Sequence, residues 1–275
     1  MNDDTRRHRS VEAEIEVPGT PEPVWETIAT GPGISAWFVP TEVDGREGGE
    51  ISQHHGAEMD FAGIVTAWEP PRRFVYETEW RPTEAASLER TATEFLVEAR
   101  SGGTCVVRVV NSGFGSGADW DRTMESTKAG WASVLNNLRL YLTHFPGLPS
   151  GSFAAGAIAP GTRDAVWEEL TRATGLAAVE GERVASGAGS PPLSGVVETA
   201  EERSLLVRTE EPGPGLAFVG AGGPGDEVYV FVRAYIYGDD AAEIAARAGS
   251  DWQAWLDERF QTAGTATSEA GARAG

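Results

Sequence analysis

The sequence predicts an α+β fold in which an antiparallel sheet packs against a long helix, and it predicts this arrangement twice. Three observations support the prediction. A regular helical stripe of apolar residues closes the first half of the chain, strand-like segments precede it, and the same order of segments returns in the second half. Antiparallel strands with helices on one face form an α+β architecture.

The long helix is the most regular element of the sequence, and its clearest part is GWASVLNNLRLYL, residues 130–142. Apolar side chains recur there with the spacing of one helical face, and they continue toward the N-terminus. These residues are Trp120, Met124, Trp131, Leu135, Leu138 and Leu142. The helix is expected to begin near Asp119, and its apolar stripe must pack against another element.

The segments before this helix alternate between apolar and polar residues. VEAEIEV, residues 11–17, reads as a half-buried strand whose three glutamates face solvent. PEPVWETIAT opens with a proline suited to the first turn of a helix. Four further strands are expected between residues 59 and 109, with turns at PPRR (70–73) and RSGGT (100–104).

The second half repeats this order, which indicates a tandem duplication. The matching pairs are 21–38 with 163–179, 61–79 with 193–211, 103–115 with 226–238, and the helix of Trp131 with that of Trp252. The offset shrinks along the chain, so the second copy is expected to be shorter by about a strand.

Five segments follow from these boundaries. We expect a disordered tail over 1–10, a first domain over 11–145, a linker over 146–159, a second and shorter domain over 160–261, and a disordered tail over 262–275. The tails are assigned from their charged or small polar composition.

Composition excludes several classes of protein. The net charge is −20, so phosphate backbones and anionic lipid surfaces repel the chain, and no apolar run is long enough to span a membrane. We expect no nucleic acid and no membrane as partners. The charged N-terminus is not followed by an apolar segment, and the single cysteine, Cys105, fits a reducing compartment. A cytoplasmic location is therefore expected, with Cys105 buried on a strand.

No motif predicts a catalytic residue, a metal or a cofactor. His54 and His55 are adjacent, so on a strand they point to opposite faces and are poorly placed to bind one metal ion. GAGGPG, residues 220–225, has the spacing of a dinucleotide-binding loop, but a strand follows it where a helix is required. A hairpin loop is the better interpretation of that segment.

Five segments of the first half together resemble a known family. They are PVWETIATGPGISAWF (23–38), EVDGREGGE (42–50), GIVTAWEPPRRFVYETEW (63–80), SGGTCVVRVVNSGFG (101–115) and GWASVLNNLRLYL (130–142). They resemble the SRPBCC (START-like, helix-grip) superfamily, in the branch related to the activator of the heat-shock-protein-90 ATPase. The second half has neither the Trp-Phe pair nor the GGE strand start, and it resembles a degenerate second copy.

The resemblance implies a helix-grip fold, in which a curved sheet wraps around the C-terminal helix and leaves a cavity. Strand parity and the helical stripe give nine residues that could line it: Phe61, Tyr76, Trp80, Phe95, Val107, Asn111, Trp120, Met124 and Trp131. These aromatic side chains could equally fill the space as a packed core, and the sequence leaves both possibilities open.

Three functions follow from the resemblance, and the first is the leading hypothesis. It is a non-enzymatic protein that holds a small hydrophobic molecule in the cavity. The second is a protein-interaction module like the chaperone activators, which use an outer surface and a protein partner. The third is an enzyme of the polyketide cyclase or aromatase kind, for which Tyr76, Thr93, Asn111 and Cys105 are the inward polar candidates.

Overall fold

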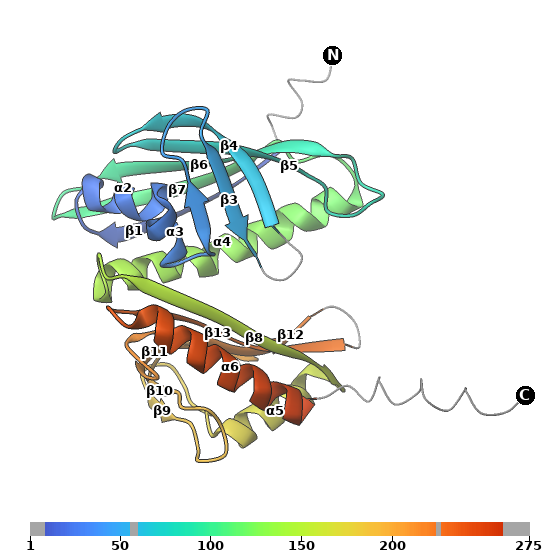
Figure 1. The fold of residues 1–275 in the computed structure, drawn as a ribbon. Coiled ribbons are helices and arrows are strands. Elements are labelled where there is room, and N and C mark those ends of the chain that lie inside the picture. Colours follow the sequence, from blue (N-terminus) through green and yellow to red (C-terminus); the bar gives the residue numbers. More distant parts are fainter. Residues whose placement is uncertain (1–8, 56–59, 224–226, 261–275) are drawn as a thin grey trace, which may run out of the picture. The chain divides into compact units, whose positions relative to one another are not determined.

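The computed structural model describes residues 9–55, 60–223 and 227–260. The chain divides into two compact units, Met1–Pro149 and Ser150–Gly275 (Figure 1). The expected disordered tails lie almost wholly outside the described residues, although the first strand already begins at Ser10. No helix among the described residues combines the length and apolar character needed to cross a membrane.

The N-terminal unit contains a seven-stranded antiparallel sheet and a long helix. Its elements are β1 (Ser10–Pro18), α2 (Pro21–Ala29), α3 (Gly31–Ser35), β2 (Thr41–Val43), β3 (Glu50–His54), β4 (Asp60–Glu69), β5 (Arg73–Trp80), β6 (Glu89–Ala99), β7 (Thr104–Ser112) and α4 (Ala118–His144). The strands lie in the order β1-β7-β6-β5-β4-β3-β2. The first strand therefore pairs with the last, and the remaining strands form a meander.

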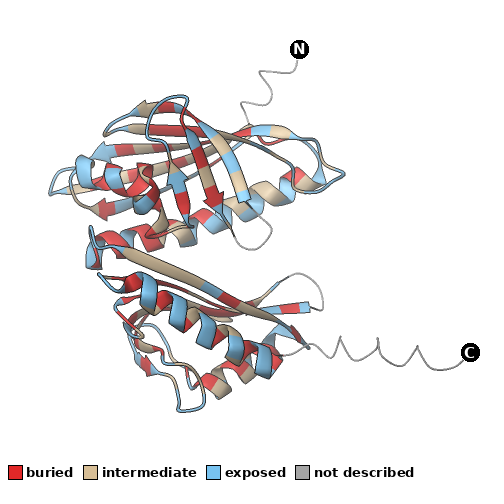
Figure 2. Ribbon diagram, viewed as in Figure 1, coloured by how far each residue is buried: buried red, intermediate tan, exposed pale blue. Residues whose placement is uncertain are grey.

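The predicted long helix is confirmed as α4, which begins one residue before Asp119. Its buried residues include five of the six members of the apolar stripe, while Met124 is half-buried. Figure 2 shows the alternation of buried and exposed residues along α4 that a helix resting on a sheet requires.

The C-terminal unit repeats this topology with a six-stranded antiparallel sheet. Its elements are β8 (Ser150–Pro160), α5 (Arg163–Thr174), β9 (Arg183–Ala185), β10 (Ser194–Glu201), β11 (Ser204–Glu211), β12 (Gly215–Gly222), β13 (Glu227–Tyr237) and α6 (Ala241–Phe260). The strand order is β8-β13-β12-β11-β10-β9, so the first strand again pairs with the last. The two units thus share the α+β helix-grip arrangement in tandem.

The expected linker over 146–159 is wrong for most of its length, because residues 150–160 form β8. This strand pairs with β13 from Ser150 opposite Tyr237 to Pro160 opposite Glu227. β8 packs closely under α6 and therefore consists mostly of small residues. These small residues hide the alternation of apolar and polar side chains by which a strand is predicted. A Cβ on Gly151 would lie 2.6 Å from the carbonyl oxygen of Ala241, so a larger side chain does not fit.

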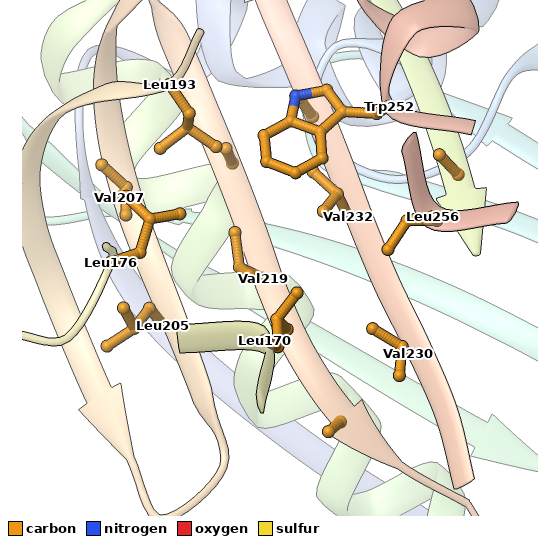
Figure 3. Close-up of a cluster of buried hydrophobic side chains, with 14 of the residues drawn as sticks. Leu170, Leu176, Leu193, Leu205, Val207, Val219, Val230, Val232, Trp252 and Leu256 are labelled. Carbon is orange, nitrogen blue, oxygen red and sulfur yellow. The ribbon is translucent and has the colours of Figure 1, made fainter. Parts of the chain in front are cut away.

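The space between the sheet and α6 in the C-terminal unit is filled by apolar side chains (Figure 3). Trp252 and Leu256 of α6 are fully buried and pack in a cluster with Val230 and Val232 of β13 and Leu170 of α5. Trp252 occupies the place in this unit that Trp131 occupies in the first. The surroundings of Trp131 are different, because it borders a cavity.

Candidate ligand cavity

A cavity of about 410 Å³ lies in the N-terminal unit, between the inward face of the sheet and α4. It is lined by Phe38, Gln53, His55, Phe61, Tyr76, Thr78, Trp80, Thr91, Thr93, Asn111, Phe114, Ser126, Thr127, Gly130, Trp131 and Val134. None of these residues is Asp, Glu, Lys or Arg.

The floor of the cavity forms where the inward face of the sheet changes from apolar to polar. Phe95 of β6 is fully buried and stacks on Phe74 of β5, with ring centroids 6.1 Å apart. The next inward side chain of β6, two residues from Phe95, is that of Thr93. Thr93 lies opposite Asn111 of β7 on one side and Tyr76 of β5 on the other. The cavity therefore begins where the aromatic packing ends.

The polar floor is held together by hydrogen bonds. The indole Nε1 of Trp131 donates to Oδ1 of Asn111, and Nδ2 of Asn111 donates to Oγ1 of Thr93 at 2.8 Å. The hydroxyl of Tyr76 donates to Oε1 of Gln53 at 3.1 Å. The first two bonds join α4 to β7 and β6, and the third joins β5 to β3, so together they fix the side chains at the bottom of the cavity.

Aromatic rings form the wall around this floor in a continuous series of contacts. Phe38 lies 5.6 Å from Trp131 and 5.4 Å from His55, measured between ring centroids. His55 in turn lies 5.0 Å from Phe61, and Phe61 lies 5.9 Å from Trp80. Most of these contacts are edge-to-face, the arrangement favoured by the quadrupoles of aromatic rings.

Burial changes the ionisation of two groups in this unit. Burial raises the pKa of the Tyr76 hydroxyl, while hydrogen bonding with Thr93 and Gln53 lowers it by less, so Tyr76 stays a neutral donor at physiological pH. Burial likewise raises the pKa of the Cys105 thiol, with a smaller contribution from Glu22. Cys105 is fully buried on β7, as expected, and does not line the cavity.

The structure brings five of the nine predicted cavity residues together at the cavity. They are Phe61, Tyr76, Trp80, Asn111 and Trp131. The other four do not line it and belong to packed regions. Phe95 and Val107 lie among the buried residues of the sheet, and Trp120 packs with Val11 and Phe114 in a small cluster against which Met124 also packs.

The sequence prediction missed several polar lining residues, although one signal was present. Thr91 has the strand parity of Thr93, and Thr78 has that of Tyr76, so all four point inward. The prediction named Thr93 as an inward polar residue but passed over Thr78 and Thr91. For Gln53 the only available sign was its position on a short strand, and His55 follows that strand directly.

The two motifs set aside in the sequence are partly described by the structure. His54 is 3.0 Å from Asp60 through Nδ1, whereas His55 lines the cavity. The described residues contain no cluster of three potential metal ligands. The first three residues of GAGGPG, Gly220 to Gly222, end β12, which pairs antiparallel with β13, and residues 224 and 225 lie outside the described part.

An antiparallel sheet that encloses a cavity with a long C-terminal helix defines a helix-grip protein. More particularly, residues 18–143 match the family described as "Activator of Hsp90 ATPase homolog 1-like protein". The match covers most of the N-terminal unit and confirms the resemblance found in the sequence.

Several solved structures are similar to this chain. Protein MLL2253 from Mesorhizobium loti is 22% identical, and the match covers 50% of this chain and 98% of that one at a TM-score of 0.45. The Aha1 dimer from Colwellia psychrerythraea is 18% identical over 50% of this chain and 99% of that one, with a TM-score of 0.42. The di-domain ARO/CYC BexL from the BE-7585A biosynthetic pathway is 12% identical over 92% and 99%, with a TM-score of 0.45. No curated protein matches the chain.

Proposed function

We propose that the N-terminal unit binds a small, largely apolar molecule in this cavity and does not transform it chemically. The observation that carries the proposal is the cavity itself, at about 410 Å³. Small-molecule sites are typically concave, mostly apolar and about 300–1,000 Å³ in volume, with a few polar groups that orient the ligand. The aromatic wall and the polar floor meet this description.

The lining residues favour binding over catalysis. The cavity has no carboxylate, lysine or arginine among its described lining residues, which leaves His55 and Tyr76 as its titratable groups. The raised pKa of Tyr76 makes it a poor general base near neutral pH. Tyr76, Thr93 and Asn111 are held in hydrogen bonds that fix the floor, a role that positions a ligand without reacting with it.

Native mass spectrometry of the protein purified from its own cells tests the proposal. A retained mass that disappears on denaturation is the expected result. Gly130 offers a matched pair of variants, because it lines the cavity on α4 and a Cβ placed there meets no atom within 4 Å. Gly130→Trp is expected to obstruct the cavity and abolish the retained mass, whereas Gly130→Ala is expected to keep it.

The results of purification and mass measurement distinguish between the competing functions. A retained small mass that survives in Gly130→Trp would place the ligand elsewhere and contradict the proposal. Co-purification of a stoichiometric protein with no small mass would instead favour the protein-interaction module. Recovery of a chemically altered product after incubation with the released molecule would favour an enzyme.

A further inference from the structure

The hydrogen bonds at the floor of the cavity have a direction, and it begins at Trp131. An indole N–H can donate but cannot accept, so the atom of Asn111 that faces it must be the oxygen. The amide nitrogen of Asn111 then donates to Thr93, which accepts through its hydroxyl oxygen and keeps its own O–H as a donor.

The same direction continues on the other side of Thr93. Tyr76 lies opposite Thr93 in the β5–β6 ladder and interacts with it by hydrogen bonding. The hydroxyl of Tyr76 donates its single proton to Oε1 of Gln53. The donors of Trp131, Asn111 and Tyr76 therefore all point away from α4 and toward Gln53.

The row ends in an unused donor. Gln53 is 5% exposed and lines the cavity, and no described residue accepts a hydrogen bond from its Nε2. This Nε2 atom is not among the fully buried side-chain atoms that lack a partner, so it is accessible from the cavity. A ligand that displaces water from this atom gains affinity if it supplies an acceptor, because otherwise the donor is left unpaired.

The charges of the cavity lining and of the whole chain also favour an uncharged ligand. A carboxylate in this cavity would meet no lysine or arginine among the described lining residues, and it would enter a chain whose net charge is −20. Burial of an unpaired charge is strongly unfavourable. The aromatic wall, by contrast, favours contact with another ring system.

We propose that the ligand is an uncharged aromatic molecule that presents a hydrogen-bond acceptor, such as a ketone oxygen, to the amide nitrogen of Gln53. The inference rests on the proposed function and adds the polarity and charge of the ligand. It assigns Gln53 as the residue that selects the ligand, with Asn111, Thr93 and Tyr76 setting the direction of its amide.

Three rigid probes of similar shape test this with the full chain. They are fluorenone, which has a ketone acceptor, fluorene, which has none, and a fluorenone carboxylate, which adds a charge. Isothermal titration calorimetry is expected to show fluorenone binding about tenfold more tightly than fluorene, the size of one buried hydrogen bond. The carboxylate is expected to bind at least about tenfold more weakly than fluorenone.

Two variants connect the preference to Gln53. In Gln53→Leu the preference for fluorenone over fluorene is expected to vanish, whereas Gln253→Leu, the same change on α6 of the other unit, is expected to retain it. Infrared spectroscopy gives a direct reading, because a hydrogen bond from Gln53 lowers the carbonyl stretching frequency of bound fluorenone and Gln53→Leu restores it.

The possible failures are distinguishable. Equal binding of fluorene and fluorenone, or tightest binding of the carboxylate, would overturn the inference while the cavity remained a ligand site. Binding of none of the three would overturn the proposed function and the inference together. If Gln53→Leu does not fold, the three probes still test the inference on the unaltered protein. The order of their affinities alone shows whether the cavity prefers an uncharged ligand with a hydrogen-bond acceptor.

Discussion

Replacement of Trp131 by alanine should destabilise the N-terminal unit less than the equivalent change at Trp252 destabilises the C-terminal unit. Both tryptophans lie on the inward face of the helix that closes their unit. Trp131 is 8% exposed and contacts Phe38 and Phe95, but its remaining side borders the cavity. Trp252 is 0% exposed and is surrounded by the packed cluster.

The expected magnitudes follow from these surroundings. Truncation of a fully packed tryptophan to alanine costs about 3–5 kcal/mol, and we expect Trp252→Ala at the upper end of that range. Trp131→Ala loses fewer packing contacts but also loses its hydrogen bond to Asn111, which is worth about 1 kcal/mol. We therefore expect about 2–3 kcal/mol for Trp131→Ala, a difference of about 2 kcal/mol between the two variants.

Urea unfolding of the full chain measures both values, provided that each unit is followed by its own transition, because two units need not unfold as one. Circular dichroism is the suitable signal, since removal of a tryptophan changes the fluorescence of the folded state. An equal loss for the two variants, or a larger loss at Trp131, would mean that Trp131 is packed on all sides. The cavity would then be closed.

Three further predictions follow from single side chains. Gly130→Ala should stabilise the N-terminal unit by about 0.5–1 kcal/mol, because alanine favours the helix and the added methyl meets no atom; a lower urea midpoint would contradict this. Cys105 should react with a thiol reagent at pH 8 only after denaturation, because it is buried and its pKa is raised; rapid labelling of the folded chain would refute this. Because the pKa of Tyr76 is raised on folding, the stability it contributes is present below the unfolded value of about 10 and is lost as pH rises toward the folded pKa. Alkaline unfolding curves should therefore be shallower in Tyr76→Phe, and unchanged curves would exclude this coupling.

The sequence predicted the elements of the fold better than it predicted the depth of the cavity. The periodic stripe of α4 and the alternation of β5, β6 and β7 are strong signals, because burial on one face imposes them. Parity alone says which face a residue occupies and not how far along the sheet it lies. Phe95 and Thr93 share a face, yet only Thr93 reaches the cavity.

The cavity residues that were missed have a physical explanation of the same kind. A change from large apolar to small polar side chains along one inward face marks the end of packing, as at Phe95, Thr93 and Thr91 on β6. Helical spacing alone does not distinguish Trp120 and Met124, which do not line the cavity, from Trp131, which does. The difference arises because Phe114 and Val11 pack against the first turns of α4. This is a tertiary contact, which helical spacing does not predict.

The pairing of each unit's first strand with its last has a consequence for synthesis on the ribosome. β1 cannot pair until β7 has been made, and β8 must wait in the same way for β13. Pairing between strands so distant in sequence slows folding, and the waiting strand exposes its edge meanwhile. Each unpaired strand has a composition that opposes aggregation: three glutamates in β1, and mostly glycine, alanine and serine in β8. The N-terminal unit can close while the C-terminal unit is still being translated, so the nascent chain has only one such edge waiting at a time.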